Sequence, residues 1–368
     1  MSSPALSTLS DGELRERVVS LGHAPWRADQ LRHAVWRPQV SDFASMLNVP
    51  AALRDQLAGA VRFSAASVAA ETTADAGRTL KLLCRLDDGL TIETVAMATA
   101  AQGASRRRCT VCVSTQVGCA VGCPFCATGH MGLRRNCSAA EIVDQVRVAA
   151  HSLHRHGLGP VTHVVYMGMG EPLANYDATL DSLRVLTGAA GIGARRITVS
   201  TSGVVPAIEQ LAREAPPVTL AISLHAATDE LRDRLVPLNR AHPIAALVAA
   251  GTRYARATGR RLTFEWCLIG GINDTDAQAV RLRELARSAR AHVNVIPMNR
   301  IHGSPWGPPD PSRARAFLGQ LRGIPVTVRD TRGGDVDAAC GQLRALLEAR
   351  RELRADGTLT APRRPLAV

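Results

Sequence analysis

The chain of 368 residues contains almost no lysine, because Lys81 is the one lysine among its 44 Lys+Arg residues and the others are arginine. Aromatic residues are scarce at 3%. We find no run of about 18 apolar residues, which argues against a membrane-spanning helix. Residues 1–14 lack the basic-then-apolar layout of a secretory signal, so we expect a cytoplasmic protein. Hydrophobic and charged fractions of 46% and 21% are typical of a soluble globular chain and exclude wholesale disorder.

Positive charge is what the sequence has in excess, with a formal net charge of +12. Arginine suits phosphate because its guanidinium presents a planar set of five donors. A strongly basic balance is also typical of nucleic-acid-binding proteins. Each short arginine cluster could be a solvated face, but together they support a surface for folded RNA. These clusters are residues 106–108, 134–135, 195–196 and 260–261.

The first 65 residues predict a small helical module. Ser10-Asp11-Gly12-Glu13 is typical of a helix start, and residues 27–36 and 51–61 carry apolar positions at helical spacing. The basic side chains of this module could form a solvated face or contact RNA; they are Arg27, Arg32, His33 and Arg37. Residues 66–105 predict a β-hairpin extension, because apolar runs flank Asp87-Asp88-Gly89.

From about residue 106 to 345, short strand-like runs alternate with helical segments. The strand candidates are 110–114, 163–167, 196–200, 218–223, 261–268 and 292–297. The helical candidates include 139–153, 177–186, 206–213 and 276–290. About six βα units indicate an α/β fold with a parallel sheet, either a barrel or a doubly wound layout. In both, function gathers at the carboxyl ends of the strands.

Nine cysteines stand at 84, 109, 112, 119, 123, 126, 137, 267 and 340. An odd number without an export signal makes a disulfide framework improbable. Cys119, Cys123 and Cys126 form C-x3-C-x2-C in a glycine-bearing loop after a strand, with Phe125 before the last cysteine. Three such thiolates can hold three corners of an iron–sulfur cube and leave the fourth iron open. The alternative is a zinc knuckle with four tetrahedral ligands, which Cys109, Cys112 or Cys137 could complete.

The other cysteines divide by their surroundings. Cys84 and Cys267 lie in apolar stretches and are predicted to be small buried hydrophobes. We expect a structural role for Cys137. On a strand, Cys109 would point to the opposite face from Cys112, so we assign it no function.

The cysteine triple with its aromatic residue resembles the hallmark of the radical S-adenosylmethionine superfamily. The resemblance narrows to the RlmN/Cfr family of RNA adenine methyltransferases and runs from about residue 10 to 345. The matching segments are 112–119, 127–129, 167–173, 200–203, 222–225 and 335–343. This resemblance implies a partial (β/α)6 barrel over residues 106–345. Residues 1–65 would form an RNA-binding accessory domain, residues 66–105 a hairpin extension and residues 346–368 a tail.

The resemblance also implies the cofactors and the chemistry. One [4Fe–4S] cluster would bind to Cys119, Cys123 and Cys126, and two molecules of S-adenosylmethionine would be used per turnover. Cys340 would carry the methyl group as S-methylcysteine, because adenine carbons 2 and 8 are electrophilic and cannot attack a sulfonium methyl, whereas a methylene radical on sulfur can add to them. Cys112 would then resolve the protein–RNA cross-link through a transient disulfide with Cys340.

The remaining implied roles concern proton transfer and ligand binding. Glu93 would accept the ring proton. Glu171 would bind the amino group of S-adenosylmethionine, and Gly168 and Gly170 would let the backbone approach the ligand. The S-adenosylmethionine contacts that the resemblance implies are Gly170, Glu171, Ser200, Ser223, Leu224, His225 and Asn299.

The expected substrate is an adenine in the peptidyl-transferase centre of 23S rRNA, methylated at carbon 2, with tRNA as a second target. The target base must be flipped out of its stack. Two alternatives stay open: carbon-8 methylation of the Cfr type, and a non-catalytic RNA-binding iron–sulfur protein. We expect a monomer that receives electrons from a donor such as flavodoxin or ferredoxin.

Overall fold

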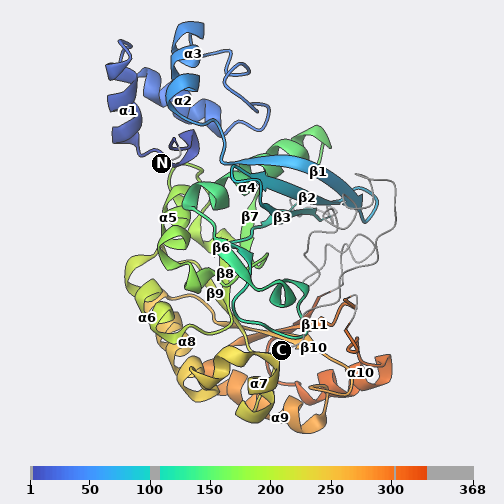
Figure 1. Cartoon of the computed structure of the whole chain (residues 1–368). Coiled ribbons are helices and arrows are strands. Elements are labelled where there is room, and N and C mark those ends of the chain that lie inside the picture. Colours follow the sequence, from blue (N-terminus) through green and yellow to red (C-terminus); the bar gives the residue numbers. More distant parts are fainter. Residues whose placement is uncertain (1–2, 100–107, 302–303, 330–368) are drawn as a thin grey trace.

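The computed structural model describes residues 3–99, 108–301 and 304–329 (Figure 1). One ten-stranded sheet runs through this part of the chain in the order β1-β2-β3-β4-β7-β8-β9-β10-β11-β12. Strands β1 to β4 pair antiparallel, and β4 to β12 pair parallel. The strands are β1 (Ala66–Ala74), β2 (Thr79–Leu86), β3 (Thr91–Ala98), β4 (Cys109–Cys112), β7 (His163–Tyr166), β8 (Ile197–Thr201), β9 (Thr219–Ser223), β10 (Thr263–Leu268), β11 (His292–Pro297) and β12 (Val326–Val328).

Helices cover the outer side of the parallel strands, which Figure 1 shows as a curved layer of α5, α6, α8, α7 and α9. The six predicted parallel strands are β4 and β7 to β11, and their ends differ from the prediction by at most two residues. These strands lie in the sheet in the order of the sequence, without the reversal of a doubly wound sheet, so the partial barrel is confirmed. The helices are α4 (Ala139–Arg155), α5 (Tyr176–Thr187), α6 (Val205–Glu214), α7 (Asp229–Leu235), α8 (Ile244–Thr258), α9 (Asp276–Ala289) and α10 (Pro311–Gln320).

Strand β10 shows how the sequence builds two faces. Phe264, Trp266 and Leu268 are at most 1% exposed and belong to the apolar core, and Trp266 packs on Phe317 of α10 with ring centroids 5.8 Å apart. The residues between them, Glu265 and Cys267, line the interior cavity. Because successive side chains of a strand alternate faces, the barrel buries its outer face against helices and keeps polar groups on its inner face.

The amino-terminal module is built from α1 (Asp11–Ser20), α2 (Arg27–Val35) and α3 (Ala51–Ala60). Its helices pack around an apolar core of their own, separate from that of the barrel. The predicted helix start at Ser10 is confirmed as a capping box, in which the Ser10 hydroxyl and the Glu13 carboxylate satisfy each other's backbone N–H groups.

Two buried residues of α4 attach this module to the barrel. Asp144 Oδ2 accepts a hydrogen bond of 2.7 Å from the backbone N–H of Ala65. Arg147 donates to the carbonyls of Val35 and Phe63, each at 3.0 Å, and pairs with Asp144 at 2.7 Å. Since these bonds are charge-assisted and shielded from water, they fix the module against α4.

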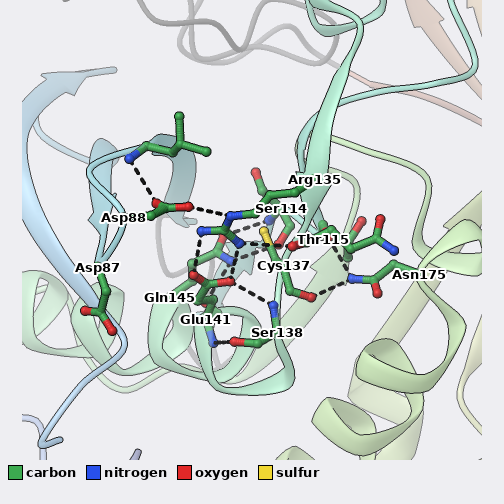
Figure 2. Close-up of polar contacts among 12 residues, drawn as sticks. Asp87, Asp88, Ser114, Thr115, Arg135, Cys137, Ser138, Glu141, Gln145 and Asn175 are labelled. Atoms are coloured by element: carbon green, nitrogen blue, oxygen red, sulfur yellow. Dashed lines mark hydrogen bonds and ion pairs between the residues drawn. The ribbon is translucent and has the colours of Figure 1, made fainter. Parts of the chain in front are cut away.

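A small hairpin that the sequence did not predict brackets the cysteine loop: β5 (Gln116–Gly118) pairs with β6 (Leu133–Asn136). On β6, Arg135 forms ion pairs with Asp88 at 2.6 Å and with Glu141 at 2.9 Å (Figure 2). The two carboxylates raise the pKa of this guanidinium. Arg135 therefore serves the fold, whereas Arg134, Arg195, Arg196 and Arg261 are exposed as an RNA surface requires.

Strands β1 and β12 and helices α7, α8 and α10 were also absent from the sequence prediction. No helix in the described ranges has both the length and the apolar character needed to cross a membrane.

Candidate active site

One cavity opens at the carboxyl ends of the parallel strands and collects most of the predicted site. Side chains from successive strand ends line it, although they are far apart in the sequence. The predicted residues that line it are Cys119, Cys123, Cys126, Gly168, Gly170, Glu171, Ser200, Ser223, His225 and Asn299. The side chain of Leu224 is fully buried and does not line this cavity, whereas those of the adjacent residues Ser223 and His225 do. The structure thus brings the predicted metal-binding and ligand-binding residues together.

The cysteine loop, residues 119–126, is shaped by glycines on both sides. A side chain at Gly118 would place its Cβ 1.8 Å from the Gly132 carbonyl oxygen, and one at Gly129 would lie 2.5 Å from the Cys123 carbonyl oxygen. Both contacts are far inside van der Waals range, so only glycine lets the hairpin and residues 127–131 pack against the loop.

The three loop thiols are partly buried and act on one another electrostatically. Burial raises the pKa of Cys119 to about 11, with further contributions from Cys126 and Glu171. Burial also raises the pKa of Cys123, an effect that Arg232 opposes. Bound iron would instead lower the pKa of these thiols, because metal coordination deprotonates them.

The arrangement fits an iron–sulfur cube better than a zinc site. Among the described residues, no group of three or more His, Cys, Asp or Glu side chains could share a single metal ion. A zinc knuckle needs four ligands on one ion, whereas a cube spreads its thiolates over different irons. Three partly buried thiols in one cavity, beside the ligand-binding residues, satisfy the second requirement.

Glu171 is held rigidly at the edge of this cavity. Its Oε2 accepts hydrogen bonds of 2.6 Å from both the backbone N–H and the hydroxyl of Ser202, and its Oε1 accepts one of 3.0 Å from the Leu173 N–H. Gly170 has φ +98°, and a Cβ there would lie 2.5 Å from the Cβ of Gln116. The glycine motif therefore brings this segment against β5, while Gly168 and Gly170 also line the cavity.

His225 occupies a strained position opposite the cysteine loop. Its φ of +59° is unusual for a residue other than glycine. Its Nδ1 accepts a hydrogen bond of 2.9 Å from the Cys267 N–H, and its ring packs edge-on against Phe125 with centroids 4.9 Å apart. Burial lowers the pKa of His225 to about 3, so the imidazole is neutral at physiological pH.

Arg232 of α7 is a site residue that sequence reasoning missed. It is fully buried and donates to the carbonyls of Ser202, Ser223 and Leu224, at 2.6, 3.1 and 3.0 Å. Burial lowers its pKa to about 10. Nothing in the sequence of α7 separates Arg232 from the exposed Arg234, because only the tertiary packing reveals which one points inward.

Glu265 is a second missed residue of the cavity, and here the sequence held a signal: a lone acid between Phe264 and Trp266 in a strand. It is 5% exposed, and its Oε2 accepts a hydrogen bond of 2.6 Å from the Asn294 amide. Burial raises its pKa.

The structure places Glu93 and Cys112 on one face of the sheet. Val95 of β3 pairs with Cys112 of β4, and Glu93 lies two residues before Val95, so all three share a face. Cys112 in turn pairs with Val165, two residues before the cavity-lining Met167. The predicted proton acceptor and the predicted resolving cysteine therefore lie on the surface that leads into the cavity.

Ser114 joins Glu93 to the glycine motif. Its hydroxyl donates 2.6 Å to the Glu93 carbonyl and accepts 2.9 Å from the Met169 N–H. Gln145 of α4 binds the Ser114 backbone on both sides, at 2.7 and 2.8 Å (Figure 2). This network fixes the backbone of Glu93 relative to Gly170 and Glu171.

Cys340, the predicted methyl carrier, lies outside the described residues. Cys84 and Cys137 are at most 1% exposed, as expected for structural cysteines. Cys109 Sγ contacts the Leu158 carbonyl at 3.2 Å, on the helix side of β4 and away from Cys112, as predicted. The prediction for Cys267 was wrong, because it is only partly buried and lines the cavity.

Comparisons with known proteins agree with this geometry. Residues 113–283 match the model of the radical SAM superfamily, and residues 5–62 match that of the ribosomal RNA large subunit methyltransferase N-terminal domain. The chain is 45% identical over 337 residues to the "Probable dual-specificity RNA methyltransferase RlmN" of Moorella thermoacetica, covering 90% of this chain and 94% of that protein. A protein of the same name from Thermobifida fusca is 46% identical over 350 residues, covering 92% and 94%.

A solved structure is similar over nearly the whole length. The crystal structure of a radical SAM methyltransferase from Sphaerobacter thermophilus superimposes with a TM-score of 0.88 at 49% identity, covering 93% of this chain and 99% of that one.

Proposed function

Because the chain belongs to the RlmN family of radical S-adenosylmethionine RNA methyltransferases, we propose that it methylates carbon 2 of an adenine in the peptidyl-transferase centre of 23S rRNA and of a tRNA adenine. The observation that carries the proposal is the single cavity in which the cysteine loop, Glu171 and the polar ends of the later strands converge. We place this activity in the cytoplasm, with the enzyme as a monomer and a flavodoxin or ferredoxin as electron donor.

Each predicted site residue of the cavity has a proposed task. Cys119, Cys123 and Cys126 hold one [4Fe–4S] cluster, and Glu171, Ser200, Ser223, His225 and Asn299 bind S-adenosylmethionine together with the backbone at Gly170 and Leu224. When bound, these cofactors supply the radical that activates a methyl group on sulfur. The neutral imidazole of His225 adds no charge beside the cluster, and the fixed Glu171 carboxylate offers a negative charge to the ligand's amino group.

The catalytic side chains act on the RNA base. Cys340 carries the methyl group, and its sulfur stays bonded to the base through a methylene bridge after carbon 2 is attacked. Glu93 takes the proton from carbon 2. The thiolate of Cys112 then attacks the sulfur of Cys340, which forms a disulfide and breaks the bond to the methylene carbon, and that carbon takes a proton from solvent to become the methyl group. Placement of Glu93 and Cys112 on one face of the sheet supports this division of labour. Two molecules of S-adenosylmethionine are consumed for each methyl group delivered.

The RNA is held by positive charge outside the cavity. The exposed arginines of the barrel suit phosphate contacts. In the amino-terminal module, residues 1–65, the Trp26 ring is 51% exposed and lies under the guanidinium of Arg27 at 3.9 Å. Such a platform can stack an unpaired base.

The test is nucleoside analysis after reaction. The protein is reconstituted anaerobically with iron and sulfide and incubated with reductant, S-adenosylmethionine and unmodified rRNA or tRNA. Mass spectrometry of the digested RNA is expected to show 2-methyladenosine. Appearance of 8-methyladenosine instead would establish the Cfr-type reaction, and failure to cleave S-adenosylmethionine would leave a non-catalytic iron–sulfur protein.

A further inference from the structure

The lysine at position 81 forms an ion pair with Glu93 inside the protein. Lys81 Nζ lies 3.0 Å from Glu93 Oε1, and the two residues are 8% and 3% exposed. Lys81 of β2 pairs with Val95 of β3, while Glu93 pairs with Leu83, so the ammonium and the carboxylate are diagonal neighbours on one face. That face is the one that carries Cys112.

The identity of this residue is unusual for the chain. Every other member of the 44 Lys+Arg residues is arginine. The strong preference of this chain for arginine over lysine is therefore broken at the residue that contacts Glu93. The two side chains differ in ways that matter here: an ammonium is a compact point charge, whereas a guanidinium is a planar fork that engages both oxygens of a carboxylate. A guanidinium bound to both oxygens of Glu93 would compete with the substrate proton for those oxygens.

The backbone on both sides of the pair is fixed. Ser114 and Met169 hold the main chain of Glu93, and β2 lies between β1 and β3 in the sheet. Lys81 is thus a cationic partner of this carboxylate at Oε1, and a buried carboxylate that loses such a partner pays a large desolvation cost.

We propose that Lys81 is a positioning residue for Glu93: its ammonium keeps the carboxylate ionised and turned so that it can accept the proton of adenine carbon 2. The inference rests on the proposed function, because it assigns a partner to the proposed base. In the step concerned, the C–H bond at carbon 2 of the RNA adduct breaks, the proton bonds to a Glu93 oxygen, and the electron pair remains on the base.

The two half-reactions of the proposed mechanism separate this role from a structural one. Loading of the methyl group onto Cys340 needs no acceptor for a ring proton, whereas methylation of RNA does. In K81M we expect the rate of RNA methylation to fall about 10- to 100-fold, while Cys340 loading, measured from the mass of the intact protein, keeps the wild-type rate. R85M removes an exposed charge from the same strand and is expected to leave both rates unchanged.

Two further variants fix the interpretation. K81R keeps the charge and is expected to stay impaired, because the guanidinium engages both oxygens; a wild-type rate of RNA methylation in K81R would overturn the inference. In an E93Q background, K81M is expected to add no further loss, since Lys81 acts through Glu93. An equal loss of both half-reactions in K81M, or additive losses in the double variant, would show a structural role and overturn it.

The same experiment distinguishes failure of the inference from failure of the proposed function. A wild-type rate in K81M with an inactive E93Q would overturn the role of Lys81 and leave Glu93 as the base. A wild-type rate in E93Q would overturn both assignments.

Discussion

The carboxylate of Glu171 receives two hydrogen bonds of 2.6 Å from one residue, Ser202, through its backbone N–H and its hydroxyl. These two residues follow different strands, β7 and β8, so the pair ties neighbouring strand ends together at the cavity. A carboxylate fixed in this way loses little freedom when it binds an ammonium group, which favours binding.

This relationship predicts the behaviour of S202A. The variant removes the hydroxyl but keeps the backbone N–H, so we expect S-adenosylmethionine binding to weaken about 10-fold, the value of one hydrogen bond to a charged group. Calorimetric titration of the reconstituted protein measures it. S288A, which removes an exposed hydroxyl on α9, is the matched control, and equal affinity in the two variants would contradict the role of Ser202.

Loss of Arg232 should destabilise the barrel itself. R232L leaves the carbonyls of Ser202, Ser223 and Leu224 buried without this donor, and we expect a loss of about 3–5 kcal/mol in the free energy of unfolding. Urea denaturation followed by circular dichroism measures the change. R234L alters an exposed arginine on the same helix and should stay within about 0.5 kcal/mol of wild type; similar losses in the two would refute the account.

The contact between α4 and the amino-terminal module is open to a residue-level test. D144N weakens the hydrogen bond that Asp144 accepts from the Ala65 N–H, so exchange of that amide should accelerate by about 10-fold. Hydrogen exchange followed by mass spectrometry or NMR reports it. D181N changes an exposed acid of α5 and should leave this amide unaffected; unchanged exchange in D144N would mean that other contacts hold the module.

Histidine 163 gives the stability of the protein a defined pH dependence. Burial, with Arg108 and Arg196 nearby, lowers the pKa of His163 from 6.5 to about 4. Between these values the unfolded chain binds the proton and the folded chain does not, so stability from this residue is present above about pH 6.5 and is lost as the pH falls toward 4. H163Q should therefore lose less stability than wild type between pH 7.5 and 5, as measured by urea denaturation. H33Q, at an exposed site on α2, is the control, and parallel curves for H163Q and wild type would contradict the prediction.

Much of this architecture could be predicted from local patterns. The six parallel strands follow from short apolar runs between helical segments, and many of the polar residues that line the cavity follow from motifs after these runs. Residues whose roles depend on distant partners could not be found in this way. Arg232 and Arg234 look alike in the sequence, and only packing buries one of them. The pairing of Lys81 with Glu93 depends on the β2–β3 register, which the hairpin signal alone does not specify.

Two further features of the structure depend on distant partners or on strand alternation. The ion pairs of Arg135 with Asp88 and Glu141 could not be predicted, because the hairpin β5–β6 that brings these residues together is too short to show a clear periodicity. Cys267 looked buried because apolar residues surround it in the sequence, yet strand alternation turns it toward the cavity.

The most direct test of the proposed mechanism follows the hydrogens of the transferred methyl group. The reconstituted protein is incubated with RNA, reductant and S-adenosylmethionine carrying a fully deuterated methyl group. The RNA is then digested, and the masses of its nucleosides are measured by mass spectrometry. Passage through a methylene group on Cys340 predicts 2-methyladenosine with two deuterium atoms, the third hydrogen coming from solvent. Product with all three deuterium atoms, or methylation at carbon 8 alone, would contradict the account.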